Sequence, residues 1–253
     1  MKKKIQLLVI ALMAGVFMSF GQSVDEIINK HVAAMGGNEK LADLKTIRMS
    51  ANVEVGPNMK APMTMSFINN KSFRMDISMQ GMTMTTAIEG DSGWMVMPFG
   101  GKKDPERMDK EAIESSRDMM DVNGSLFNYK AKGSTVELIG KEDMEGTDTY
   151  KLKVTKKNGD IEYEYLDATS YLRLKTTTKH KFKDKETSGD ALFSNYKKVE
   201  GIMFAYTIEN RETGGSQGQI ITFDNIEVNP KFDKDLFKMP VATATESKPA
   251  DKK

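Results

Sequence analysis

Apolar and polar residues alternate with a period of two over much of the region from residue 63 to residue 98. The segments "MTMSF", "SFRMDISM", "MTMTT" and "GDSGWMVMP" follow one another there, and short turns such as Asn69-Asn70 and Gln80-Gly81 separate the first three. This period is typical of antiparallel strands with one apolar and one solvated face. The apolar members of the pattern are Met63, Met65, Phe67, Phe73, Met75, Ile77, Met79, Met82 and Met84.

A helical spacing precedes these strands. Residues 24–35 place their apolar side chains on one stripe, and Gly36-Gly37 ends it as a left-handed cap would. A second short helical turn is predicted from Asn38 to Leu44. His31 falls on the apolar stripe, so we expect a packed side chain there rather than a ligand.

A second helix is predicted over residues 105–121, within "DPERMDKEAIESSRDMMD". Pro105 suits a first helical turn, and acidic neighbours favour the same end. Met108, Ile113 and Met119 fall on one flank of this otherwise charged segment. Its place between two groups of strands predicts either a packed connection or a lid.

The second half of the chain contains a strong hairpin signal. Asn158-Gly159 separates two alternating segments, and this dipeptide favours a two-residue turn. A two-residue loop predicts one register, in which apolar residues face apolar ones and charged residues lie on a solvated face. The expected pairs are Val154/Tyr163 and Leu152/Tyr165 on the apolar face, and Lys153/Glu164 and Thr155/Glu162 on the other.

Similar strand patterns continue to residue 229, which gives roughly ten or eleven strands. A long antiparallel sheet with one apolar face must close, fold over or curl around helices to cover that face. We therefore expect a mainly β (α+β) fold: a strongly curved antiparallel sheet, or half-open β-barrel, with helices covering its mouth. Residues 22–240 would form this single domain, and the polar residues 241–253 a disordered tail.

The N-terminus has the features of a secretory signal peptide. Lys2, Lys3 and Lys4 precede an apolar stretch, and Ser19 and Gly21 supply small residues for cleavage before Gln22. We therefore expect residues 1–21 to be removed and the mature protein to be soluble in the periplasm. Loss of three lysines from 37 Lys+Arg leaves 34 against 36 Asp+Glu, a net charge of −2. This balance argues against a nucleic-acid partner.

Sequence motifs for catalysis are missing. The chain has no cysteine, and it contains no G-x-S-x-G, H-E-x-x-H or P-loop pattern. The pair Glu162/Glu164 is expected on the solvated face of the hairpin opposite lysines. We therefore predict no enzyme activity, no catalytic residue, no cofactor and no metal site. One alternative stays open, because Met-x-Met pairs on a strand could bind Cu(I) through thioether sulfurs.

Several segments resemble the outer-membrane lipoprotein-sorting proteins, specifically the LolA-like periplasmic carriers of Bacteroidetes-type bacteria. They include "IINKHVAAMGGNEKLADLKTI", "KSFRMDI", "EGDSGWMVMP", "YKAKGSTVELIGKEDMEGTDTYKLKVTKKNG", "YLDATSYLRLK" and "IEVNPKFDKDLFKMP". The resemblance implies a curved sheet whose helices lid a cavity for lipoprotein acyl chains, and it places Phe67, Phe73, Met75 and Ile77 in that cavity. Trp94 matches the aromatic residue that follows the family's Asp-Gly turn. The arginine that latches the lid in close relatives is missing around residues 69–71.

Nine of the 20 methionines lie between Met59 and Met97. Methionine is flexible and polarizable, so a Met-rich face suits a transient host for varied acyl chains, although a Met stripe is also common in plain cores. We predict a carrier that delivers lipoproteins or related lipids towards the outer membrane as a monomer, with an inner-membrane release complex and an outer-membrane acceptor as partners. An envelope lipid sensor of the same fold is an alternative. The predicted cavity residues are Met63, Met65, Phe67, Phe73, Met75, Ile77, Met79, Met82, Met84, Trp94, Met108, Ile113 and Met119.

Overall fold

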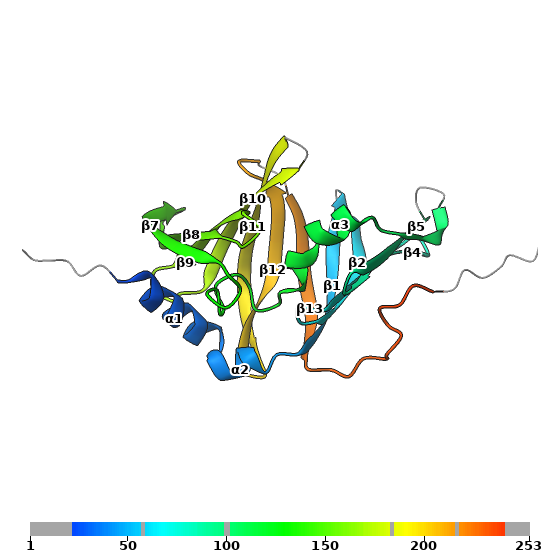
Figure 1. Cartoon of the computed structure of the whole chain (residues 1–253), viewed down its shortest axis with the longest axis horizontal. Coiled ribbons are helices and arrows are strands. Elements are labelled where there is room, and N and C mark those ends of the chain that lie inside the picture. Colours follow the sequence, from blue (N-terminus) through cyan, green and yellow to red (C-terminus); the bar gives the residue numbers. More distant parts are fainter. Residues whose placement is uncertain (1–21, 57–58, 99–101, 183–184, 216–217, 241–253) are drawn as a thin grey trace, which may run out of the picture.

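The computed structural model describes residues 22–56, 59–98, 102–182, 185–215 and 218–240 (Figure 1). The predicted signal peptide, 1–21, and the predicted tail, 241–253, lie outside the described residues. Thirteen strands form one antiparallel sheet. They are β1 (Thr46–Gly56), β2 (Met59–Ile68), β3 (Ser72–Met79), β4 (Met82–Glu89), β5 (Ser92–Met97), β6 (Lys102–Arg107), β7 (Thr135–Met144), β8 (Thr147–Thr155), β9 (Ile161–Asp167), β10 (Arg173–Phe182), β11 (Lys185–Val199), β12 (Ile202–Glu212) and β13 (Gly218–Val228).

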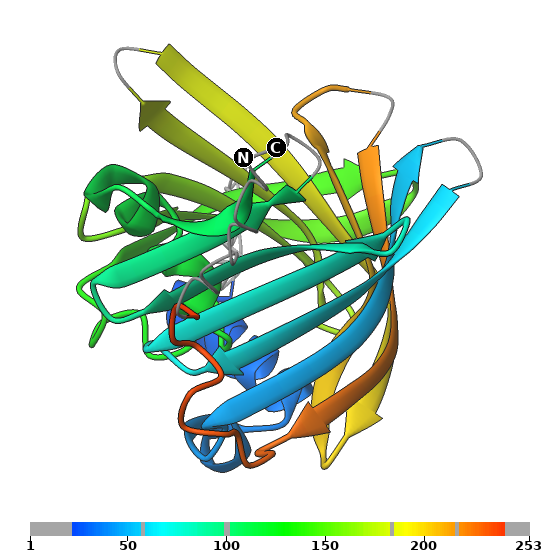
Figure 2. The ribbon, with the colours of Figure 1, turned by 90° about the vertical axis from the view of Figure 1, so that its right-hand side faces the viewer.

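The strand order is β6-β5-β4-β3-β2-β1-β13-β12-β11-β10-β9-β8-β7. Each half of the chain therefore forms a meander, and β1 joins the two halves by pairing with β13. Strands β6 and β7 are the two ends of this order, so the sheet is open, and Figure 2 shows how strongly it curls. The predicted curved antiparallel sheet is confirmed, with thirteen strands in place of ten or eleven.

Two helices precede the sheet, as predicted. Helix α1 (Val24–Met35) begins at an N-cap, Ser23, whose hydroxyl accepts a hydrogen bond from the Glu26 N–H. Gly36, at φ 134°, follows the helix in a backbone conformation that favours glycine. Helix α2 (Asn38–Ala42) comes next. The buried face of α1 packs against β12 and β7, on the concave side of the sheet (Figures 1 and 2).

The predicted helix over residues 105–121 is wrong in its first part. Pro105 lies in strand β6 at the edge of the sheet, where proline is tolerated because one side of the strand needs no ladder donor. The helical residues are restricted to α3 (Lys110–Ser115) and the 3₁₀ helix η2 (Arg117–Met120). Asp109 begins α3, because its carboxylate accepts the Ala112 N–H at 2.7 Å.

The predicted hairpin between β8 and β9 exists, but its register differs by one residue. The Lys156 N–H donates to the Asp160 carbonyl at 2.9 Å, which leaves a three-residue loop with Gly159 at φ 92°. Leu152 is therefore opposite Glu164, and Val154 is opposite Glu162. A shift of one residue exchanges the two faces of a strand. The expected pairs Val154/Tyr163 and Leu152/Tyr165, like Lys153/Glu164 and Thr155/Glu162, are wrong.

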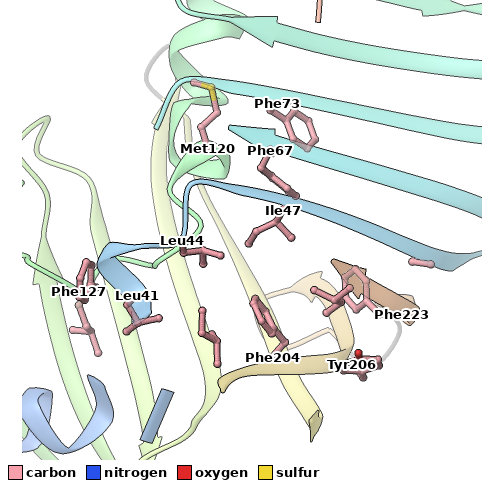
Figure 3. Close-up of a cluster of buried hydrophobic side chains, with 14 of the residues drawn as sticks. Leu41, Leu44, Ile47, Phe67, Phe73, Met120, Phe127, Phe204, Tyr206 and Phe223 are labelled. Atoms are coloured by element: carbon pink, nitrogen blue, oxygen red, sulfur yellow. The ribbon is translucent and has the colours of Figure 1, made fainter. Parts of the chain in front are cut away.

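The core fills the space between the concave face and the helices. Figure 3 shows Leu41 and Leu44, which follow α1, pointing toward Ile47 of β1 and Phe127. Side chains from β12 and β13 complete this cluster. Burial of apolar area at ~25 cal/mol per Å² stabilises the curl, since the apolar faces meet only when the sheet wraps around them.

Candidate functional site

The apolar side chains of β1 to β4 form cross-strand layers on the concave face. The layer nearest the helices pairs Ile47 with Phe67, Phe67 with Phe73, and Phe73 with Ile88. The Phe67 and Phe73 rings lie 5.1 Å apart, centroid to centroid. Because facing residues in adjacent strands point the same way, these side chains form one continuous surface.

Methionines dominate the next two layers. Met49 pairs with Met65 and Met65 with Met75; the following layer joins Met63, Ile77 and Met84. We call these six side chains the methionine ladder: Met49, Met63, Met65, Met75, Ile77 and Met84. Met63 is buried, and the other five are half-buried. The ladder is therefore an apolar surface that the protein itself only partly covers.

A segment between β6 and β7 covers the inner end of this face. We call residues 108–134 the covering segment. Met120 and Ile113 are buried, and Met120 belongs to the same core cluster as Phe67 and Phe73, beside which Figure 3 draws it. Close approach depends on Gly93 of β5, because a Cβ at that position would lie 2.9 Å from Met108 Sδ and 3.0 Å from Ile113 Cγ1.

Polar contacts hold the covering segment to the strand turns. The Asn70 N–H donates to the Met120 carbonyl at 2.8 Å, at the β2–β3 turn. Arg117 forms ion pairs with Glu114 and with Asp91 of the β4–β5 turn. An arginine therefore links the covering segment to the sheet, although it comes from the segment and not from the turn at residues 69–71.

Most predicted cavity residues lie on the concave face or against it. Met63, Phe67, Phe73 and Ile113 are buried, while Met65, Met75, Ile77, Met79, Met82, Met84 and Met108 are half-buried. Met119 differs, because its side chain is 50% exposed while its neighbour Met120 points inward. Met120 is thus the residue of the 3₁₀ helix that packs against the strands, and Met119 does not belong to the face.

The prediction that Trp94 lines the cavity is wrong. Trp94 pairs with Ala87, whereas its neighbour Gly93 pairs with Ile88 of the concave face, so Trp94 points to the convex side. Its indole N–H donates to the Phe237 carbonyl at 2.9 Å. Arg74, also on that side, donates to the Leu236 carbonyl at 2.7 Å. The C-terminal segment thus crosses the convex face (Figure 2), where Trp94 and Arg74 donate to its carbonyls.

His31 is a packed side chain, as expected. Its Nδ1 donates to the Tyr171 carbonyl across 2.8 Å, and the ring is buried between α1 and the sheet. Burial lowers the pKa of His31 to about 4, and the nearby Arg173 charge acts in the same direction. The imidazole is therefore neutral at pH 7 and serves to join α1 to the β9–β10 turn.

The second half of the concave face carries Glu162 and Glu164, which we expected on a solvated face. Glu164 is fully buried. The Arg173 guanidinium donates to it twice, Nε to Oε2 and Nη2 to Oε1, each at 2.6 Å. Lys156 pairs with Glu162 at 2.9 Å and with Asp118 of the covering segment at 2.8 Å. We call Asp118, Ser125, Lys156, Glu162, Glu164 and Arg173 the ionic cluster.

The pKa values in the ionic cluster diverge. Burial raises the pKa of Glu164 to about 7; the neighbouring Glu162 charge adds to this and Arg173 opposes it. Lys156 and Arg173 outweigh burial at Glu162 and hold its pKa at about 2. Ser125 Oγ lies 2.5 Å from Glu162 and 2.7 Å from Glu164, and a hydroxyl has only one proton to donate. If Glu164 is protonated, its carboxyl group donates to Ser125 Oγ and the Ser125 hydroxyl donates to Glu162, so both contacts are hydrogen bonds.

Among the described residues, no cluster of three or more His, Cys, Asp or Glu side chains could hold a metal ion. In the same part of the chain, no helix is long and apolar enough to cross a membrane.

Searches against family models and curated proteins return no match. Solved structures do match. A LolA superfamily protein from Nitrosomonas europaea has a TM-score of 0.54 and 12% identity, covering 86% of this chain and 98% of that chain. The chain has a LolA-like fold. A domain provisionally named an outer membrane lipoprotein-sorting protein, from Vibrio parahaemolyticus, has a TM-score of 0.54 and 14% identity over 84% of this chain and 95% of its own.

A DUF1329 family protein from Desulfovibrio piger shares the LolA-like fold as well. Its TM-score is 0.56 at 16% identity, with 86% of this chain and 98% of that chain covered. Identities at this level establish a common architecture. Many functions share one fold, so the function of this chain depends on its own residues.

Proposed function

We propose that this protein binds the acyl chains of lipoproteins or related lipids on the methionine ladder and carries them through the periplasm towards the outer membrane. The observation that carries this proposal is the half-buried state of the ladder. A plain core would cover these side chains, whereas five of the six keep part of their surface open on a concave, apolar face.

The energetics of the ladder suit a transient host. Each acyl CH₂ that leaves water contributes about 0.8 kcal/mol, so a short length of chain already binds with several kcal/mol. A carrier must also release its cargo. Methionine side chains can repack around chains of different length and branching, because their three rotatable bonds and polarizable sulfur tolerate many arrangements. Branched aliphatic side chains would define a more rigid surface.

The fold supports the same proposal without deciding it. One neighbour of like fold is named for outer membrane lipoprotein sorting. On the proposed function, an inner-membrane release complex would load the carrier and an outer-membrane acceptor would unload it. Depletion of a carrier would strand lipoproteins in the inner membrane, whereas loss of a lipid sensor would change only a response.

A native mass spectrum tests the binding step. Protein purified from a periplasmic fraction without detergent should retain a lipid-sized mass, and Met75→Asp should lose it, because a carboxylate would lie in the centre of the ladder. Ser78→Asp is the matched control: Ser78 is exposed on the opposite face of the same strand. A copper-sized mass would instead support Cu(I) binding. Protein with neither mass, and no uptake of added lipid, would contradict the proposal.

A further inference from the structure

A cavity lies beside the ionic cluster. Its volume is about 360 Å³, within the range of small-molecule sites, roughly 300–1,000 Å³. The covering segment forms one wall through Asp118, Asp121 and Ser125, and the β8–β9 hairpin and β10 form the other. Charged and hydroxyl side chains dominate this lining, in contrast to the methionine ladder.

Most charges around the cavity already have partners. Lys156 is held by Asp118 and Glu162, and Arg173 by Glu164. Lys132 pairs with one oxygen of Asp121, Oδ2, and also donates to the Gly124 carbonyl at 2.7 Å. These pairs fix the walls, so the shape of the cavity is preformed.

Four polar groups on the walls have no hydrogen-bond or ion-pair partner among the described residues. Asp121 Oδ1 is buried and has no hydrogen-bond partner, although buried acceptors in proteins normally have one. Within the described part of the chain, no hydrogen bond or ion pair engages the side chains of Lys157, Ser134 or Thr176, which also line the cavity. The unused capacity is thus one ammonium group, two hydroxyls and one buried carboxylate oxygen.

We propose that this cavity binds the polar head of an amphiphile, a head that carries a phosphate group together with hydroxyl or ammonium donors. Lys157 supplies an unpaired positive charge for the phosphate, and Ser134 and Thr176 supply hydroxyl donors. A donor on the head group would satisfy Asp121 Oδ1. This inference rests on the proposed function, because it assigns the head to the cavity and the acyl chain to the methionine ladder.

The 3₁₀ helix η2 lies at the border between the two regions. Met120 packs against the apolar face, whereas its neighbours Asp118 and Asp121 line the charged cavity. Successive side chains of one short turn therefore face opposite environments. This arrangement matches an amphiphile, whose head and tail differ in the same way.

Calorimetric titration of the purified protein with three probes tests the inference. The probes are lysophosphatidylethanolamine, its chain-matched monoacylglycerol, which lacks the phosphate, and glycerophosphoethanolamine, which lacks the chain. Lys157→Glu should weaken binding of the lysophospholipid by at least about tenfold, because a charged contact becomes repulsive. The same variant should leave the affinity for the monoacylglycerol within about twofold.

The matched control is Lys198→Glu, since Lys198 is exposed on β11 and outside the cavity. It should change neither affinity. An unchanged lysophospholipid affinity in Lys157→Glu would overturn the head-group site while leaving acyl binding intact. Binding of glycerophosphoethanolamine without any binding of the monoacylglycerol would refute the proposed function instead. Inorganic phosphate is titrated in addition as a competitor. If it displaces glycerophosphoethanolamine with equal affinity, the cavity is a free-anion site and the inference is overturned.

Discussion

Arg173 and Glu164 form a two-pronged ion pair in the interior of the concave side, with both N–O distances at 2.6 Å and the carboxyl fully buried. The pair lies on the face that also carries Leu152 and Val154. Buried pairs of this kind contribute little net stability, yet breaking one leaves an uncompensated polar group. We therefore expect single and double variants of Arg173 and Glu164 to differ in their free energy of unfolding.

Arg173→Met should lower the free energy of unfolding by about 3–5 kcal/mol, because Glu164 would stay buried without its partner. Arg173→Met combined with Glu164→Leu should recover most of that loss, since an apolar pair replaces the charges. Urea unfolding of the single and double variants measures both. A double variant as unstable as Arg173→Met alone would show that the pair contributes more than charge compensation.

The pH dependence of stability follows from the same carboxyl. The pKa of Glu164 is raised from 4.5 to about 7, so the folded state binds more protons than the unfolded state between these values. Its contribution is fully present below about pH 4.5 and is lost as the pH rises through about 7. Glu162 acts oppositely, because its lowered pKa gives stability that is lost as the pH falls from 4.5 through about 2.

Glu164→Gln tests this sign. The amide mimics the protonated acid, since its oxygen can accept from Arg173 and its NH₂ can donate to Ser125. Relative to the parent, the variant should gain stability as the pH rises from about 5 to about 8, because it lacks the carboxyl whose charged form burial disfavours. The free energy of unfolding is measured for both proteins across this range. A parent whose stability rises more steeply than the variant's over that range would contradict the assignment.

The hairpin around Asn158-Gly159 shows where the sequence was informative and where it was not. The dipeptide correctly located the turn, but alternation alone allowed two registers, because both faces of β9 carry large side chains. Tyr163 and Tyr165 looked apolar and were assigned to the core. They instead lie on the convex side, where the ammonium of Lys151 lies 5.5 Å and 5.1 Å from their ring centroids. The same one-residue shift in register places Glu162 and Glu164 on the concave face.

The apolar face from β1 to β4 was predictable for the opposite reason. Every second residue there except Thr86 is apolar, so only one register places Met65, Met75 and Ile77 together. Trp94 shows the limit of this pattern, since "GWMVM" is apolar at each position and alternation cannot assign a face. Trp94 and Phe237 are 143 residues apart in sequence, so no local sequence pattern predicts their contact.

Gly93 should be intolerant of a side chain. Gly93→Ala would place a Cβ within 2.9 Å of Met108 Sδ, so the covering segment would have to shift outward. We expect a loss of about 1–3 kcal/mol in the free energy of unfolding and faster proteolysis within residues 108–134. Gly56→Ala is the control, because the nearest atom to its added Cβ is Met59 Cε at 3.9 Å. Equal effects of the two substitutions would argue against close packing at Gly93.

Trp94 gives a fluorescence test of the face assignment. It is the single tryptophan, and it lies on the convex side under the C-terminal segment. Binding of a fatty acid should leave its emission maximum unchanged. In a separate experiment, Trp94→Phe removes the hydrogen bond to Phe237 and should expose residues 230–240 to proteases. A blue shift or strong quenching on addition of a brominated fatty acid would place the ligand on the convex face instead.

The methionine ladder can be observed directly by methyl NMR. With methionine methyl groups labelled with ¹³C, a spin-labelled fatty acid broadens the resonances that lie near its chain. We expect broadening of the Met65, Met75 and Met84 resonances. Signals from Met203, on the convex face of β12, and from Met144, in the β7–β8 turn region, should be unaffected. Broadening confined to Met144 and Met203, or no broadening of any methionine at saturating fatty acid, would contradict acyl binding on the ladder.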